Sequence, residues 1–107
     1  MIRVINLTPH DINIVGDDGQ VTESFPASGE LARCDVEREQ IGEINGIPVN
    51  RTVFGAVTGL PEQQEGVVYI VSALVAQATK RDDVLIPDDA VRDEQGRIIG
   101  CRAFARV

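Results

Sequence analysis

Apolar and polar positions alternate along much of the first 60 residues. Ile12 and Ile14 alternate with Asp11 and Asn13, which is the two-residue period of a half-buried strand. Similar patterns predict further strands over residues 2–7, 21–25, 31–36 and 49–57. The intervening turns are short, for example Gly16–Gly19 and Pro26–Gly29, and parallel crossovers need longer connections. The pattern therefore predicts an antiparallel meander over this half of the chain.

Two stretches within this half depart from simple alternation. Glu37 to Glu43 is polar and predicts a helical turn or a loop. Asn45-Gly46 is a turn of the type that closes a β-hairpin. Gly55 interrupts the strand over residues 49–57, so a bulge or a close backbone approach is expected there.

The segment from Gly66 to Arg92 predicts a strand, a helix and a second strand. Val67 to Val71 is the most continuously apolar run and is expected to form a central strand. One principal helix is predicted over about residues 73–81, followed by a short strand, Val84 to Ile86, that Pro87 stops. The two strands would be parallel neighbours joined by a crossover. A last strand is predicted over residues 97–107, with Gly100 in its middle.

Together these elements predict one strand-rich α+β domain over residues 1–107, with a mainly antiparallel sheet and one principal helix. Its 107 residues can bury a core without disulfides or metal. Aromatic residues make up only 4%, so Val, Ile, Leu and Ala must supply that core.

The charge balance narrows the classes of partner. The formal net charge is −7, whereas a protein that binds duplex nucleic acid needs a positive surface. No polybasic membrane patch and no long apolar run is present. Neither duplex nucleic acid nor a membrane is therefore expected as a partner. A local cationic pocket for one small anion remains compatible with the net charge.

Cysteine and histidine usage argues against metal chemistry. Cys34 and Cys101 are the two cysteines, and the N-terminus lacks a signal-peptide pattern, so we expect free thiols in a reducing cytoplasm. A zinc site needs more His and Cys than the chain has, and no Gly-rich phosphate loop occurs. The sequence therefore predicts no cofactor and no metal.

Ser72 begins the predicted helix directly after the apolar strand. Its hydroxyl is a natural N-cap, and the free N–H groups behind it would also suit a small phosphate or carboxylate. At the other end, Arg81 either complements the helix dipole or forms a fork for an anion. Asp82 and Asp83 could accept hydrogen bonds from ribose hydroxyls or ring N–H groups, but further metal ligands at fixed spacing are missing.

His10 is the single histidine and follows Thr8-Pro9. A catalytic triad with Ser72 or a cysteine has no supporting motif, so a turn histidine or a ring that stacks on a ligand is the preferred interpretation. The predicted ligand-binding residues are Thr8, His10, Ser72, Arg81, Asp82, Asp83 and Arg92.

Several phrases resemble a family of small proteins encoded by phage and bacterial genomes. They are Asn6-Leu7-Thr8-Pro9-His10-Asp11-Ile12, Phe25-Pro26-Ala27-Ser28-Gly29, Thr58-Gly59-Leu60-Pro61, Val68-Tyr69-Ile70-Val71-Ser72 and Arg81-Asp82-Asp83-Val84-Leu85-Ile86-Pro87. Small phage proteins of this size include sponges that bind nucleotide-derived immune signals without cleaving them. The resemblance implies a similar role in the host cytoplasm, but carries over no binding residue.

Three functions follow as hypotheses. The first is non-catalytic sequestration of a small anionic, nucleotide-like ligand, with a homo-oligomer expected because a small domain most easily builds a deep pocket between subunits. The second is an acidic interaction module that inhibits a host protein. The third is a small hydrolase that uses His10.

Overall fold

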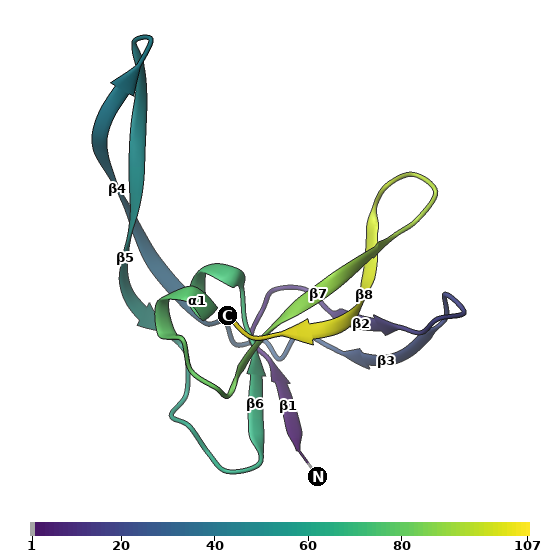
Figure 1. Ribbon diagram of the computed structural model, residues 1–107. Coiled ribbons are helices and arrows are strands. Elements are labelled where there is room, and N and C mark those ends of the chain that lie inside the picture. Colours follow the sequence, from purple (N-terminus) through teal and green to yellow (C-terminus); the bar gives the residue numbers. More distant parts are fainter. Residues whose placement is uncertain (1) are drawn as a thin grey trace.

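A computed structural model of the protein, which describes residues 2–107, shows eight strands and one helix (Figure 1). In chain order the elements are β1 (Arg3–Asn6), β2 (Ile12–Val15), β3 (Val21–Phe25), β4 (Arg33–Ile44), β5 (Ile47–Thr58), β6 (Val67–Ile70), α1 (Ala73–Thr79), β7 (Val84–Arg92) and β8 (Ile98–Ala105). The chain is strand-rich with one short helix and mainly antiparallel pairing, as predicted in outline.

The strands form a six-stranded sheet in the order β1-β6-β7-β8-β2-β3 and a separate two-stranded sheet, β4-β5. The larger sheet is mixed, because β1 and β7 run parallel to β6 and β2 runs parallel to β8. The predicted meander is therefore wrong at two places: β1 pairs with β6 and not with β2, and β3 and β4 lie in separate sheets. The local pattern marks strands but not their neighbours, and β1 joins β6, whose Tyr69 and Ile70 are at most 1% exposed.

The prediction of a helical turn or loop from Glu37 to Glu43 is also wrong, because these residues lie within β4. β4 and β5 form a hairpin that projects from the rest of the molecule (Figure 1). Both faces of its outer part meet solvent, so the strand lacks the apolar alternation by which a strand is recognised. The turn at Asn45-Gly46 is confirmed, with φ values of 52° and 79°.

A bulge at Gly55 is confirmed as well. The register between β4 and β5 shifts between Cys34 and Val36, and a Cβ at Gly55 would lie 3.1 Å from the Cβ of Asp35. The missing side chain lets the two strands approach at the point where the hairpin leaves the core.

The sequence predicted that Pro87 ends the strand that begins at Val84, and this prediction is wrong. β7 continues to Arg92, and Pro87 pairs with Phe104 of β8. The last residue of β7 that pairs with β6 is Leu85, so beyond it one side of β7 is a free edge. A proline is tolerated there because a free edge needs no N–H donor.

The core lies between β6 and α1. Tyr69, Val71 and Val75 are each at most 1% exposed, and Leu7 and Val84 pack in the same cluster. β6 is paired on both sides and leads through α1 to its parallel neighbour β7, as predicted. The helix ends at Thr79 and not near residue 81, because Lys80 adopts a left-handed conformation with φ 50°.

The molecule is extended for its length. Its radius of gyration is 16.5 Å, whereas a compact domain of this length has about 13 Å. The β4–β5 hairpin projects on one side of the core, and the β7–β8 and β2–β3 hairpins extend on the other (Figure 1). Within residues 2–107, no helix combines the length and the apolar character needed to cross a membrane.

Candidate functional site

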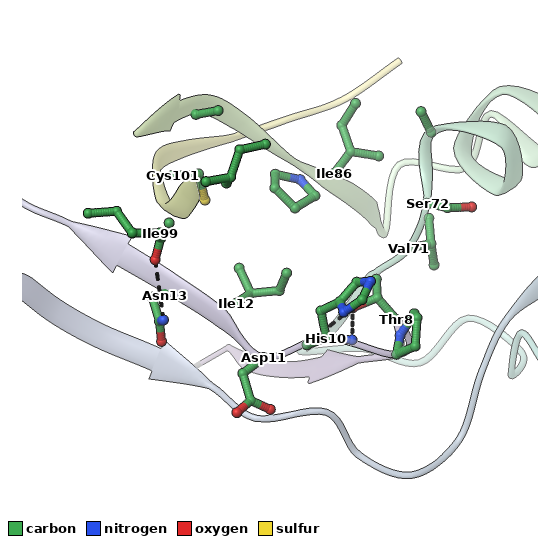
Figure 2. A pocket seen from close by; sticks show the side chains of 16 residues that line it. Thr8, His10, Asp11, Ile12, Asn13, Val71, Ser72, Ile86, Ile99 and Cys101 are labelled. Carbon is green, nitrogen blue, oxygen red and sulfur yellow. Dashed lines mark hydrogen bonds between the residues drawn. The ribbon is translucent and has the colours of Figure 1, made fainter. Parts of the chain in front are cut away.

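A groove of about 830 Å³ lies between the loops that follow β1 and β6 and the surface of β7 and β8 (Figure 2). Its polar end contains Thr8, His10 and Ser72, three of the predicted binding residues. β1 and β6 are parallel and in register, with Asn6 opposite Ile70. Because parallel strands end at the same edge of a sheet, the residues two positions beyond, Thr8 and Ser72, meet at the same rim.

The loop that carries Thr8 and His10 is held by Asn6, whose side chain is 2% exposed. The Asn6 amide nitrogen donates to the backbone oxygens of His10, at 2.7 Å, and Phe25, at 2.9 Å. The Asn6 side-chain oxygen accepts from the Thr8 backbone N–H, at 2.9 Å, and from the Thr8 hydroxyl, at 2.7 Å. One buried amide thus fixes the rim of the groove to β1 and to the end of β3.

His10 reaches the groove from this loop and is itself exposed (Figure 2). Its backbone accepts and donates hydrogen bonds, but within residues 2–107 no hydrogen bond involves its imidazole. Nucleophilic catalysis requires a base in contact with the nucleophile and oriented by a third group. Within the part of the chain that the structure describes, the imidazole thus lacks the orienting hydrogen bond that a triad would use.

The opposite wall of the groove is apolar. It includes Ile12 from β2, Ile86 from β7, and Ile99 and Cys101 from β8. Gly100 permits this wall to form, since a Cβ there would lie 2.6 Å from the backbone oxygen of Asn13. A side chain at position 100 would push β8 away from β2 and disrupt this apolar wall.

Ser72 is the N-cap of α1, as predicted. Its hydroxyl accepts a hydrogen bond from the backbone N–H of Val75 at 3.4 Å, and its backbone has extended geometry. The helix has only seven residues. Capping therefore accounts fully for a serine at this position. Ser72 also lies on the rim of the groove.

Arg81 lies outside the groove and is bound within the protein. Its guanidinium pairs with the carboxylate of Asp83, with Nε 2.9 Å from Oδ1, and donates to the backbone oxygen of Pro61 at 3.0 Å. The hydrogen bonds that Arg81 donates to the Asp83 carboxylate raise the pKa of Arg81 above its usual value. Asp83 is 5% exposed, so the pair neutralises a buried charge beneath the loop that precedes β6.

Arg81→Ala is expected to lower the free energy of unfolding by about 3 kcal/mol, because it leaves the buried Asp83 carboxylate without its partner. Urea denaturation would measure the loss. Arg102→Ala is the matched control, since the Arg102–Asp17 pair is exposed on both sides and should contribute little. Equal losses in the two variants would contradict the structural role of Arg81.

The remaining predicted residues lie elsewhere. Asp82 and Asp83 border a smaller hollow of about 230 Å³ next to residues 63–66, and the backbone oxygen of Asp82 accepts from Arg106. Arg92 donates to the backbone oxygen of Gly96 in the β7–β8 hairpin. The predicted ligand-binding residues thus lie in three places: the groove, the surroundings of Arg81 and Asp83, and the β7–β8 hairpin.

Two features of the groove escaped the sequence predictions. One is Asn6, whose signal was available as a lone amide inside an apolar strand, where burial requires hydrogen-bond partners. The other is the apolar wall from β2, β7 and β8, which no sequence pattern could assemble. Among residues 2–107, no three His, Cys, Asp or Glu side chains gather as metal ligands would.

Comparisons of this chain with protein-family models, with curated proteins and with solved structures gave no match.

Proposed function

We propose that this chain is a non-catalytic binding protein that holds a small molecule in the groove between Thr8 and Ile99. The observation that carries the proposal is the groove itself. Its volume of about 830 Å³ falls in the range of small-molecule sites, and it combines an apolar wall with a few polar groups at one end.

The lining favours a ligand with a ring or another apolar body. Ile12, Ile86 and Ile99 offer apolar contact, and the exposed His10 ring is available for stacking. None of the lining residues is Lys or Arg, and Asp11 adds a negative charge. An anionic group would therefore be placed toward solvent, with its ring in the groove. A nucleotide-derived signal meets this description when its base, and not its phosphate, is recognised.

Calorimetric titration of the protein with nucleosides, mononucleotides and cyclic nucleotides would test the proposal. We expect binding by at least one ligand that carries a base, with little dependence on the phosphate. Ile99→Glu places a charge on the apolar wall and should weaken binding tenfold or more, which corresponds to about 1.4 kcal/mol. Ile99 is 43% exposed, so the substitution should leave the fold intact.

Val21→Glu is the matched control, because Val21 is an exposed strand residue on β3 away from the groove. It should bind as the unchanged protein does. Mass spectrometry of the mixtures would show the ligand unaltered. Absence of binding throughout the panel, equal binding by both variants, or conversion of the ligand to a product would each refute the proposal.

A further inference from the structure

The β4–β5 hairpin carries several large apolar side chains that are exposed to solvent. Each strand has 12 residues, and outside the base the two strands pair only with each other. Near the tip, Ile44 and Ile47 lie opposite each other and are 64% and 66% exposed. A two-stranded ribbon is marginal in water, and a third strand is what usually makes such a sheet stable.

The free edges of the two sheets are protected to different degrees. β1 has only four residues, β3 has five with Glu23 in its centre, and the free side of β7 beyond Leu85 carries Pro87, Asp88 and Asp89. β4 is long but carries six charged side chains: Arg33, Asp35, Glu37, Arg38, Glu39 and Glu43. Short length and charge are the usual means by which proteins prevent edge-to-edge pairing.

β5 lacks this protection. It is equally long, is rich in Val, Thr and Phe, and has Arg51 as its one charged residue. Arg51 is paired across the hairpin with Glu39 at 2.8 Å. β5 is therefore the one long edge, among the strands of residues 2–107, whose single charged side chain is already paired with a carboxylate of its own hairpin.

The charge of the hairpin also favours a second copy of this chain as the partner of β5. The hairpin, residues 33–58, carries four acidic and three basic side chains, so it contributes −1 of the formal net charge of −7. Two copies of an acidic protein meet the least repulsion where their own charge is nearly balanced. A two-fold interface brings the same strand of both copies together, and a nearly uncharged strand can meet its own copy without repulsion.

We propose that β5 pairs antiparallel with β5 of a second copy, which joins the two hairpins into a four-stranded sheet in the order β4-β5-β5-β4. Pro48 cannot donate a hydrogen bond and marks one limit of the pairing, and the bulge at Gly55 marks the other. Between them the register with β4 shifts once more, between Val49 and Asn50, so the regular segment is Asn50–Phe54. Thr52 lies near its middle and hence near the two-fold axis.

Thr52→Glu and Thr52→Lys test this interface, because each variant brings like charges together at the axis. Native mass spectrometry and light scattering should show that the unchanged protein is a dimer. Each variant alone should dissociate at least tenfold more readily, and the equimolar mixture of the two should recover a heterodimer. Recovery in the mixture also proves that both variants are folded.

Thr22→Glu supplies the matched control, since Thr22 is an exposed threonine on the protected edge strand β3 and should leave the dimer unchanged. Ile99→Glu should also remain dimeric, which separates this proposal from that of the ligand groove. A monomeric unchanged protein would overturn the proposal. So would a dimer that persists in both Thr52 variants, or a mixture that stays monomeric although circular dichroism shows folded strands.

Discussion

Gly59→Ala is expected to lower the free energy of unfolding by about 3 kcal/mol or more, through two separate effects. Gly59 has φ +79°, a conformation that costs an L-residue about 1–2 kcal/mol. A Cβ at Gly59 would also lie 2.1 Å from the backbone oxygen of Leu31. Backbone cannot rotate away as a side chain can, so the strands at the base of the hairpin must shift, at a further cost of about 1–3 kcal/mol.

Gly66→Ala separates the two effects. Gly66 has nearly the same φ, +75°, but a Cβ there would meet no atom within 4 Å. It should cost about 1–2 kcal/mol, the conformational part alone. Urea denaturation of both variants at one fixed protein concentration would compare them, since the proposed dimer would make stability depend on concentration. Equal losses would show that the contact with Leu31 carries no cost.

Asn6→Ala should have an effect of similar size, a loss of about 3 kcal/mol, because one substitution removes four hydrogen bonds beneath the groove rim and leaves only those between Thr8 and His10. The backbone oxygens of His10 and Phe25 and the backbone N–H of Thr8 would all lose a partner. Leaving a buried polar group unsatisfied costs about 1–3 kcal/mol, and Asn6 is 2% exposed. Thermal and urea denaturation would measure the loss.

Asn13→Ala is the control for Asn6→Ala. Asn13 also bonds through its side chain, to the Ser24 hydroxyl and to the backbone of Ile99, but both bonds are exposed to solvent. Water can replace them, so the loss should be about 0.5 kcal/mol. Asn6→Ala should also loosen the loop that carries His10, which hydrogen exchange of the residue 8–10 amides would report. Unchanged exchange and stability would contradict the role assigned to Asn6.

The elements that the sequence predicted well are those whose pattern results from burial. Val67–Val71 is apolar throughout because β6 is covered and paired on both sides, and Ser72 begins a helix because its hydroxyl caps it. Turn chemistry was equally informative, since Asn45-Gly46 closes the hairpin through backbone conformations that these residues adopt easily.

The incorrect predictions share a different cause. The Glu37–Glu43 part of β4 was predicted as a helical turn or loop because both of its faces meet solvent, and its strand conformation depends on cross-strand bonds to β5. Pro87 was predicted to end its strand, but a strand tolerates proline where its N–H side is unpaired. Whether that holds depends on which neighbour β7 has beyond Leu85. In each case the deciding contact is made with a segment that the local pattern does not contain.

The candidate site divides in the same way. Thr8, His10 and Ser72 were recognised as polar residues at the ends of strands, and the parallel pairing of β1 with β6 brings them to one rim. Arg81 was also recognised, but the nearby carboxylate of Asp83 occupies its guanidinium. Residue type shows what a side chain can bind, whereas the fold determines whether it is free to do so.

The sequence by itself determined the strand-rich class, the helix after Ser72 and the turn at Asn45-Gly46, because hydrophobic period, capping and backbone preference act over a few residues. Tertiary structure alone decided that β1 pairs with β6, that the apolar wall faces His10, and that β5 is a free edge. These features depend on contacts between segments far apart in the chain. Such contacts are selected by the packing of the whole molecule and leave little trace in any single segment.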